Sequence, residues 1–387
     1  MRPYEELVKH ILMNGKERGD RTGTGTVSVF GTKSEYHMFN GFPLFGKRSV
    51  SLKWIQGELE WLLAGEGNIR ELKKKGITIW DEWALKREDV MVDSNVCGLR
   101  LMLAATSKGL QRPVGNVFEI EKWCKETGTD FEKILDYVEG DLGPIYPVQW
   151  RNFDGVDQIK ETLRTCKEHP FSRRHYVSAW NPQYLPDERF TPEQNVLNGK
   201  MALAPCHHGF QFYVEDLSLN ERLMHALIMI RKWDLVQVVH GTGNQRNNAL
   251  GALGIFRTQD EREIHAILDE RNVPTKGISI EFVMRSSDVI LGTPYNVASY
   301  AMLLMMYARI LGYAPLRVIH QCGDAHIYLN HLEQIDEMMQ RDTPALPQLY
   351  WAEDTPNDID DPADYRWEHF ELVGYKPGPR MDFPIAK

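Results

Sequence analysis

The residues from Ala202 to Val214 constrain the fold more than any other part of the chain. Phe210, Phe212 and Val214 occupy every second position, and this alternation predicts a β-strand. Cys206 precedes that strand, after a proline and before two histidines, so the strand would carry a thiol to a polar pocket. A cysteine presented in this way is a candidate nucleophile, and a buried structural cysteine is the alternative.

The overall composition is that of a globular protein. Hydrophobic residues make up 42% and charged residues 26%, and no apolar run approaches the roughly 18 residues of a membrane span. The first residues lack the pattern of a secretory signal, so we expect a cytoplasmic protein, in the host cytoplasm if it is viral. Five cysteines without CxxC spacing argue against a disulfide framework or a zinc site, and we expect no metal.

The charge balance limits the partners. A net charge of −9 disfavours direct binding to nucleic acid, because phosphate contacts need a basic surface. A local arginine cluster is enough for a small anionic substrate.

Apolar periodicity predicts the main elements. Helices are expected over residues 4–14, 52–64, 131–138, 156–168 and 297–311, and also near 219–230 and 264–268. Strands are expected at 27–30, 175–180, 210–214 and 278–284. Asn296 or a neighbour would cap the helix over 297–311. His240 to Asn248 is interpreted as a glycine-rich polar loop.

Seven further motifs point to one family when they are taken in order along the chain. They lie at residues 20–26, 79–83, 140–146, 172–174, 285–288, 292–296 and 323–328. Together with Pro205-Cys206-His207 and Gln211-Phe212, they resemble the motifs of thymidylate synthases and their pyrimidine hydroxymethylase relatives. The resemblance covers most of the chain except two segments.

The resemblance implies an α/β (α+β) fold. We expect one thymidylate-synthase-like domain over residues 1–387, with a large mixed sheet at a homodimer interface and helices around it. Residues 84–139 would be a helical insertion and residues 216–278 a second insertion.

The family's chemistry explains the need for a thiol. The Cys206 thiolate would add to C6 of a uracil ring, so that C5 can attack the one-carbon unit of 5,10-methylenetetrahydrofolate, the co-substrate. An unperturbed cysteine has a pKa near ~8.5, so a nearby cation is needed, and Arg285 matches the family's residue. Glu58, Tyr146 and His207 would organise water and move protons, and Asp288 would contact the pterin. A solvated helix glutamate is the alternative for Glu58.

The same resemblance implies which residues bind the two substrates. The nucleotide would be held by Arg21, Arg173, Arg174, Gln211, Ser286, Asn296, His326 and Tyr328 in addition to Arg285. Folate would be held by Trp80, Trp83, Leu203, Asp288, Leu291, Gly292, Tyr295 and Ala386. In the family the residues that match Arg173 and Arg174 reach the partner subunit's phosphate, so a homodimer is implied. Plain surface charge is the alternative for this pair, and a plain turn is the alternative for Arg21.

Asn296 and several departures from the family pattern refine the expected reaction. A carboxamide can accept from N3–H and donate to O4 of uracil, whereas cytosine would suit a carboxylate, so dUMP is expected. The departures from the usual synthase pattern are Ser51, Pro147, His208-Gly209, Met284 and Lys387. Because most of them lie near the folate or water side, we favour a dUMP hydroxymethylase, which ends its reaction with water, as in viruses that make modified DNA. A thymidylate synthase, which ends with hydride, is the alternative. A non-catalytic relative that binds nucleotide or RNA is a more remote one.

Overall fold

The computed structural model describes residues 2–20, 23–92, 122, 124–128, 130–239, 244–256 and 258–385. The chain forms two compact units. The first comprises Met1–Gln56, Glu161–Tyr176 and Gly209–Lys387, and the second comprises Gly57–Lys160 and Val177–His208. Helices and strands alternate irregularly along the sequence, which confirms the expected α/β fold class.

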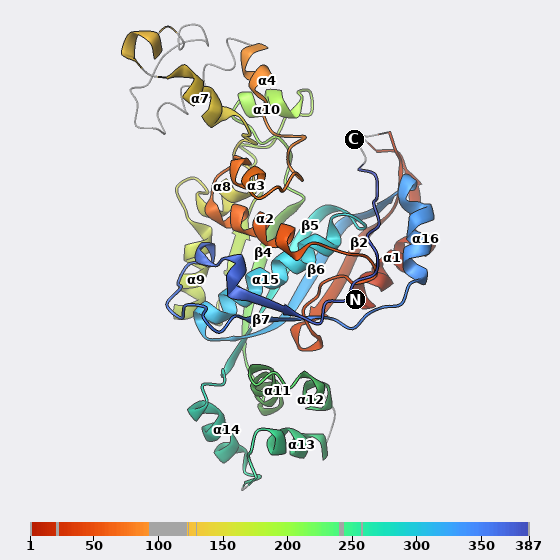
Figure 1. Ribbon diagram of the computed structural model, residues 1–387, viewed down its shortest axis with the longest axis vertical. Coiled ribbons are helices and arrows are strands. Elements are labelled where there is room, and N and C mark those ends of the chain that lie inside the picture. Colours follow the sequence, from red (N-terminus) through yellow and green to blue (C-terminus); the bar gives the residue numbers. More distant parts are fainter. Residues whose placement is uncertain are drawn as a thin grey trace. The chain divides into compact units, whose positions relative to one another are not determined.

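A six-stranded sheet is the largest element of the fold, with the spatial order β1-β2-β6-β5-β4-β3 (Figure 1). Its strands are β1 (Lys16–Arg18), β2 (Thr26–His37), β3 (Tyr176–Ser178), β4 (His207–Asp216), β5 (Lys276–Asp288) and β6 (Ala314–Tyr328). β2 is antiparallel to β6, whereas β5 is parallel to β6, so the sheet is mixed as predicted. β4 and β5 are neighbours in the sheet, so the long segment between them connects two adjacent strands.

Helix α15 (Thr293–Leu311) covers β5 and β6 in the first unit. It is buried along most of its length, because apolar residues surround it on all sides. Its first turn contains Pro294, and Gly312 ends it with a left-handed φ of 68°. The predicted cap at Asn296 is wrong. Proline suits the first turn, so the helix begins earlier than expected, Gly292 is the N-cap, and Asn296 lies inside the helix.

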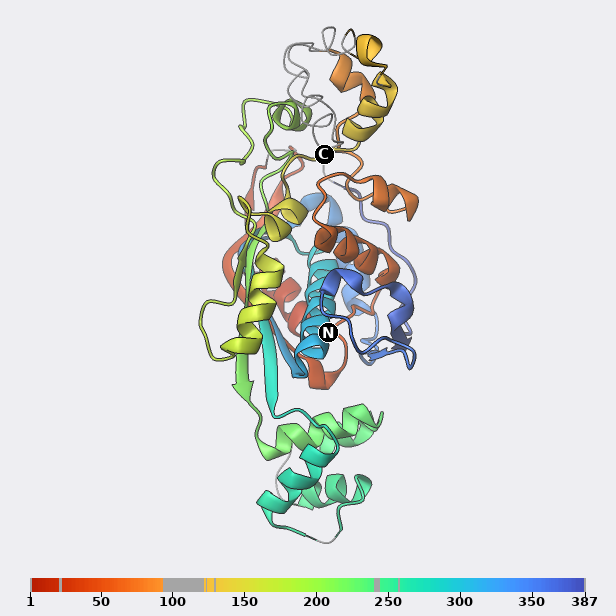
Figure 2. The same ribbon diagram turned by 90° about the vertical axis from the view of Figure 1, so that its left-hand side faces the viewer.

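Four helices follow β4 and pack on one another: α11 (Leu219–Met229), α12 (Trp233–Val239), α13 (Asn244–Ala252) and α14 (Glu261–Glu270). Figures 1 and 2 show them gathered beyond the end of β4 and the start of β5. Their apolar side chains form a common core that includes Leu223, Leu227, Leu250 and Ile264. The helices expected near residues 219–230 and 264–268 are therefore confirmed.

The loop expected at 240–248 is wrong in its second half, because α13 begins at Asn244. Asparagine and glycine are weak helix formers, but Ala249 and Leu250 are buried in the helical core. Tertiary packing thus outweighs the local propensity.

The first unit also contains α1 (Arg2–Asn14), α16 (Leu332–Gln340) and a two-stranded sheet of β7 (Gln348–Trp351) and β8 (Phe370–Val373). The second unit contains α3 (Arg70–Lys74), α4 (Arg87–Val92), α7 (Phe131–Val138), α8 (Tyr146–Arg151) and α10 (Pro192–Leu197). Two helices, α2 (Leu52–Ala64) and α9 (Gln158–Glu168), contain the boundaries between the units.

The helices predicted at 4–14, 52–64, 131–138 and 156–168 are confirmed within one or two residues at each end. The strand expected at 175–180 is shorter, because only Tyr176–Ser178 pairs in the sheet. Residues 93–121, in the expected insertion over 84–139, lie outside the described residues. No helix in the described part of the chain is long and apolar enough to cross a membrane.

Candidate active site

Cys206 lies at the entrance to β4, one residue before the strand begins. Its backbone N–H donates to the hydroxyl of Tyr146 at 2.6 Å. The side chain is partly exposed, whereas the three other described cysteines are buried. Exposure beside a fixed backbone is what a nucleophilic thiol requires.

Tyr146 begins the short helix α8 and stacks on His207. The two ring centroids are 4.1 Å apart with an interplanar angle of 12°, and Trp150 packs edge-on against His207 at 6.2 Å. Burial and, as a smaller cause, the nearby charge of His208 together lower the pKa of His207 to about 3. His207 is therefore neutral at physiological pH, and its ring can exchange hydrogen bonds without carrying charge.

Glu58 lies on α2 and accepts a hydrogen bond from the indole Nε1 of Trp80 at 2.9 Å. Burial raises the pKa of Glu58 to about 7, although the bond from Trp80 acts in the opposite direction. A carboxyl group with this pKa can take up and release a proton near neutral pH. The Trp80 ring in turn packs edge-on against Tyr146 at 6.0 Å and against Trp83 at 5.9 Å.

Glu58, Trp80, Tyr146, Cys206 and His207 thus form one continuous cluster inside the second unit. We call it the thiol cluster. Leu203 is also in this unit and is partly exposed.

A second group of candidate residues lies in the first unit, where β5 leads into α15. Asp288 ends β5, and its Oδ1 accepts from the backbone N–H groups of Ile290 and Leu291 at 2.9 and 3.0 Å. This carboxylate therefore shapes the turn that carries Leu291 and Gly292. Tyr295 and Asn296 follow in the first turns of α15, and both are partly exposed.

The adjoining stretches of β5 and β6 carry further candidates. Asp288 pairs with His326 in the parallel register, and Ser286 pairs with Asp324. His326 and Tyr328 project from β6 with their rings edge-on at 5.3 Å. Arg285 is exposed, and a side chain at Gly323 would lie 2.7 Å from the Arg285 carbonyl oxygen, so the close approach of the two strands requires glycine there.

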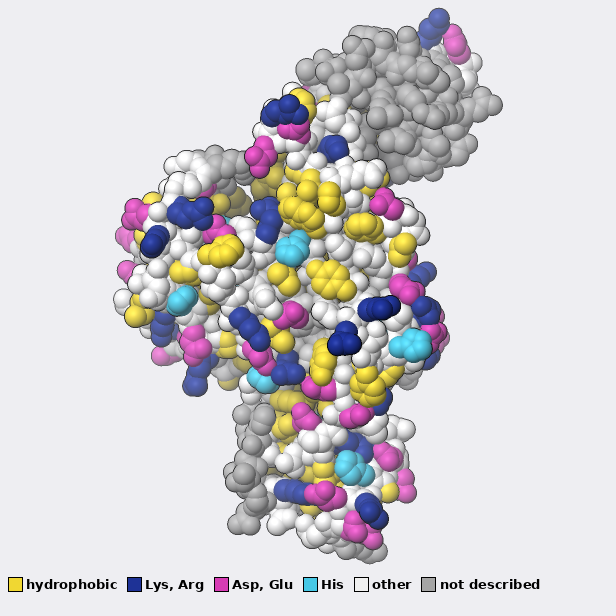
Figure 3. Space-filling model, turned by 180° about the vertical axis from the view of Figure 1, so that it is seen from behind, with side chains coloured by type: hydrophobic (Ala, Val, Ile, Leu, Met, Phe, Trp, Pro, Cys, Tyr) yellow, Lys and Arg dark blue, Asp and Glu magenta, His cyan; other side chains and the backbone are white. Residues whose placement is uncertain are grey.

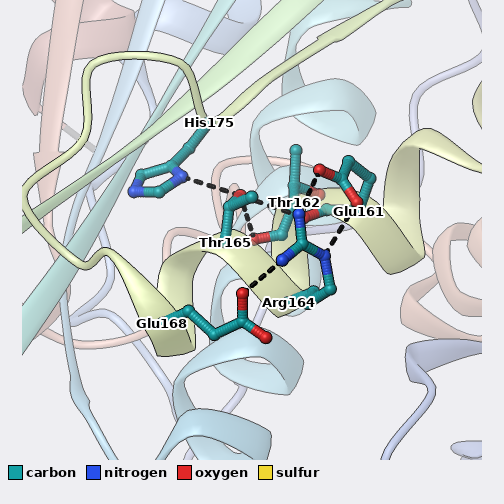
Figure 4. A network of polar contacts seen from close by, with 6 residues as sticks. All are labelled: Glu161, Thr162, Arg164, Thr165, Glu168 and His175. Atoms are coloured by element: carbon teal, nitrogen blue, oxygen red, sulfur yellow. Dashed lines mark hydrogen bonds and ion pairs between the residues drawn. The ribbon is translucent and has the colours of Figure 1, made fainter.

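Arg173 and Arg174 are exposed on the segment between α9 and β3. The carbonyl of Arg173 accepts from Gln211 Nε2 at 3.1 Å, so Gln211 holds the segment that carries both arginines. The next residue, His175, is buried and fastened to α9, because its Nδ1 lies 3.1 Å from the hydroxyl of Thr165 (Figure 4). Figure 4 also shows Arg164 joined to Glu161 and Glu168, which tightens the last turns of α9.

Two expected ligands, Arg21 and Ala386, lie outside the described residues. Among the residues that the structure does describe, no group of His, Cys, Asp and Glu side chains has the arrangement of a metal site.

Several departures from the family pattern have a structural reason. Pro147 lies in the first turn of α8, where its fixed φ suits the helix. A Cβ at Gly209 would lie 2.0 Å from the Tyr176 hydroxyl, so Tyr176 fills the space that a side chain would take. The hydroxyl of Ser51 accepts from Trp54 N–H at 3.3 Å and steadies the start of α2. Met284 is buried, and Lys387 lies outside the described residues.

The ring of His208 packs edge-on against Trp180 at 6.3 Å, whereas the ring of His207 stacks on Tyr146. Consecutive residues of a strand point to opposite faces, so the two rings leave β4 on different sides. His208 is therefore outside the ring stack of the thiol cluster.

Three tryptophans that pack around these residues, and the contact between His175 and Thr165, were not predicted from the sequence. Trp61 packs on Trp80 at 5.6 Å, Trp150 on His207 and Trp180 on His208. Trp61 lies three residues after Glu58, on the same side of α2, so helical spacing was a usable signal for it. The contact between His175 and Thr165 had no such signal.

The arrangement suits nucleophilic and acid–base chemistry, because it joins a partly exposed thiol to a carboxyl group that titrates near neutral pH. Comparison with known proteins identifies the family to which the chain belongs. The sequence profile described as "Thymidylate synthase" matches residues 2–240 and 265–387, and the chain belongs to that family. A protein named thymidylate synthase from Mycoplasma mobile is 33% identical over 386 residues, which cover 100% of both chains.

Proposed function

We propose that this protein transfers the one-carbon unit of 5,10-methylenetetrahydrofolate to C5 of dUMP. The observation that carries the proposal is the thiol cluster, in which Cys206 is linked to Tyr146 and, through Trp80, to Glu58. Membership of the thymidylate synthase family supports the same reaction.

In the proposed reaction the Cys206 thiolate bonds to C6 of the uracil ring, and C5 becomes able to attack a carbon electrophile. Methylenetetrahydrofolate, when bound, supplies that electrophile. The bond to sulfur later breaks, and the thiolate is restored. Arg285 is the cation assigned to favouring the thiolate, and together with Arg21 and the partner-facing pair Arg173 and Arg174 it would bind the phosphate.

Proton movement is assigned to the thiol cluster. Glu58 has a pKa of about 7, so both protonation states are populated at neutral pH and the group can act as acid or base. His207 stays neutral and, with Tyr146, would order water near the ring. Asn296 is assigned to the N3–H and O4 edge of uracil, which favours dUMP over dCMP.

The remaining candidates are assigned by family resemblance. Gln211, Ser286, His326 and Tyr328 would complete the nucleotide site. Trp80, Trp83, Leu203, Asp288, Leu291, Gly292, Tyr295 and Ala386 would complete the folate site, and the apolar and aromatic side chains among them fit a flat heterocycle.

Two endings of the reaction are open to the enzyme, and we propose the hydride ending, which makes dTMP and dihydrofolate. It is supported by the full-length likeness to a thymidylate synthase and by the packing of His208 on Trp180, outside the ring stack. The water ending, which gives 5-hydroxymethyl-dUMP for modified viral DNA, is the second candidate. It is favoured by the nearness of His208 to the cluster, since its charge lowers the pKa of His207, and a histidine there could hold water.

Mass analysis of the product made from dUMP and methylenetetrahydrofolate separates the endings. We expect dTMP with stoichiometric dihydrofolate, and 5-hydroxymethyl-dUMP with tetrahydrofolate would overturn the hydride ending alone.

Cys206→Ser should abolish turnover and leave dUMP binding intact. A wild-type protein that forms no covalent adduct with 5-fluoro-dUMP and methylenetetrahydrofolate would instead favour a binding protein without activity.

We also propose that the active form is a homodimer. Along β2 and β6 buried residues alternate with partly exposed ones, so one sheet face is less covered in the single chain. Phe30 and Tyr213 are exposed large hydrophobics on the strands, and Figure 3 shows hydrophobic side chains among charged ones on the side opposite to that of Figure 1. Sedimentation should give a dimer, and an active monomer would contradict it.

We also propose that the chain is one thymidylate-synthase-like domain over residues 1–387, with insertions at 84–139 and 216–278. The packing of α11 to α14 on one another, in a hydrophobic core that also takes in Phe39, Ala314 and Leu316, supports the second insertion. No disulfide joins the four cysteines that the structure describes, which favours a reducing compartment such as the cytoplasm.

A further inference from the structure

A pocket of about 550 Å³ lies in the first unit, at the end of α15 that is remote from Asn296. Its walls come from α11, α12, the last turns of α15 and β7. The helix has 19 residues and therefore extends about 28 Å. Asn296 lies in its first turns, whereas Ala308 and Gly312 in the pocket lie at its end, so the pocket is separate from the proposed nucleotide site.

The pocket has aromatic walls. Trp233 packs edge-on against Tyr350 at 6.4 Å, and Trp351 follows Tyr350 on β7. Tyr313 and Phe42 complete the aromatic lining. A cavity of this size with such walls is typical of sites for flat, ring-containing small molecules.

Four polar atoms of the lining side chains are buried and have no hydrogen-bond partner within the described part of the chain, and Nε1 of Trp233 and Nε of Arg309 are two of them. The other two are Nδ1 of His225 on α11 and Oε1 of Gln348 on β7. A buried polar atom without a partner costs about 1–3 kcal/mol, so a ligand that satisfies both would gain affinity from them. Burial lowers the pKa of His225 to about 4, so its ring is neutral at pH 7 and can donate or accept.

Three helices have their C-terminal ends at this pocket, and these ends influence which ligand charge the pocket favours. Arg231 after α11, Asn272 after α14 and Gly312 after α15 all line it, and all three have left-handed φ values of 57°, 55° and 68°. The C-terminal end of a helix carries partial negative charge, so the three ends favour a ligand that presents N–H donors.

The two arginines that line the pocket each have partners already. Arg231 pairs with Glu371 at 2.7 Å and lies over the Tyr350 ring at 4.3 Å. Arg309 lies over the Trp351 ring at 4.8 Å and donates to the Thr355 carbonyl. Because each guanidinium already has partners, an anionic ligand would gain little from them.

We propose that this pocket is a second ligand site that binds an uncharged aromatic heterocycle of the nucleobase class. The ring would stack among the aromatic walls, an N–H of the ligand would donate to Gln348 Oε1, and His225 Nδ1 would bond a second ring atom. A nucleobase carries donors and acceptors on one flat edge and meets these requirements.

Isothermal titration of the full-length protein with adenosine, guanosine, deoxycytidine and thymidine tests the proposal, with saturating dUMP present to occupy the nucleotide site. We expect at least one nucleoside to bind, and to bind more tightly than its 5′-monophosphate. If none binds, if every binding signal disappears when dUMP is added, or if the monophosphate binds more tightly, the proposal is wrong.

Variants connect the binding to the pocket. Gln348→Leu and His225→Phe each remove the unpartnered polar atom, together with the other polar atom of the same side chain, at similar size and should weaken nucleoside binding about tenfold. Gln334→Leu is the matched control, because Gln334 Oε1 is also buried without a partner among the described residues but does not line the pocket. Circular dichroism melting checks that each variant folds. Wild-type affinity in both folded pocket variants, or an equal loss in Gln334→Leu, would overturn the assignment.

Discussion

At the scale of single residues, Glu58 couples activity to stability. Burial raises the pKa of its carboxyl group from 4.5 to about 7. The unfolded chain ionises this group from about pH 4.5 upward, whereas the folded chain holds the proton until about pH 7. Folding is therefore penalised above pH 4.5, and the penalty is complete above pH 7.

Replacing Glu58 by glutamine should separate these two effects. We expect Glu58→Gln to lose most of its turnover and the titration near pH 7 in its rate profile. At pH 8 it should be more stable than the wild type, by on the order of 2–3 kcal/mol, and the gain should vanish near pH 4. Urea unfolding across pH measures this. Glu60→Gln is the control, since Glu60 pairs with Lys75, and equal pH profiles for the two variants would contradict the assignment.

At the scale of elements, the contact between β3 and β4 explains an unusual glycine. Gly209 leaves room for the hydroxyl of Tyr176, which lies 2.0 Å from where a Cβ would stand. Gly209→Ala should therefore cost roughly 1 kcal/mol, because the tyrosine must move. In a Tyr176→Ala background the same change should be neutral or stabilising, since the space is then free.

A double-mutant cycle by urea unfolding measures this coupling. Gly251→Ala is the control, because its added Cβ would meet only Phe256, at an ordinary 3.7 Å. Equal costs of Gly209→Ala in both backgrounds would show that Tyr176 does not fill the gap.

Within the four-helix group, Arg222 on α11 fastens the end of α14. Its guanidinium is buried, donates to the carbonyls of Val273 and Pro274 at 2.9 and 3.1 Å, and pairs with Asp269 at 2.6 Å. Arg222→Met keeps the apolar stem but removes these bonds, and should cost on the order of 3 kcal/mol.

Hydrogen exchange should become faster in residues 261–275 of this variant, ahead of the rest of the first unit. Asp269→Asn should have a much smaller effect, because the Asp269 side chain is 58% exposed. Unchanged exchange in Arg222→Met would show that the hydrophobic core alone holds α14.

At the scale of the whole molecule, buried histidines make the fold sensitive to acid. Burial lowers the pKa of His207 to about 3 and of both His225 and His320 to about 4. An unfolded histidine takes up a proton near pH 6.5, so the unfolded state binds more protons below that pH. The free energy of unfolding should therefore fall from about pH 6.5 toward pH 4.

His320 offers the clearest test of this sensitivity. It lies on β6, stacks on Phe282 at 4.8 Å, and neither ring nitrogen has a partner in the described ranges. His320→Phe should flatten the decline by up to about 1.4 kcal/mol for each pH unit in this range. Exposed His10→Phe should leave the slope unchanged. Parallel declines in wild type and His320→Phe would refute the role of this residue.

Much of the fold could be predicted from local pattern. The alternation in residues 210–214 and the apolar spacing in α2, α7 and α14 predicted elements that are present, because each pattern reflects burial of one face. The start of α15 was predicted too late, because proline is accommodated in the first turn of that helix. Part of α13 was predicted as a loop, because packing in the shared helical core overrides local propensity.

The sequence by itself determined which reactive groups the protein has: a thiol after a proline, a helix glutamate and paired arginines. These follow from the sequence alone because the type and order of residues are fixed by the covalent chain. Only the tertiary structure decided that Trp80 bonds Glu58, 22 positions away, and that burial shifts the carboxyl pKa to about 7. It also decided that His208 turns toward Trp180 and that Tyr176 fills the gap at Gly209. Desolvation and steric fit depend on residues distant in sequence, so no local pattern contains them.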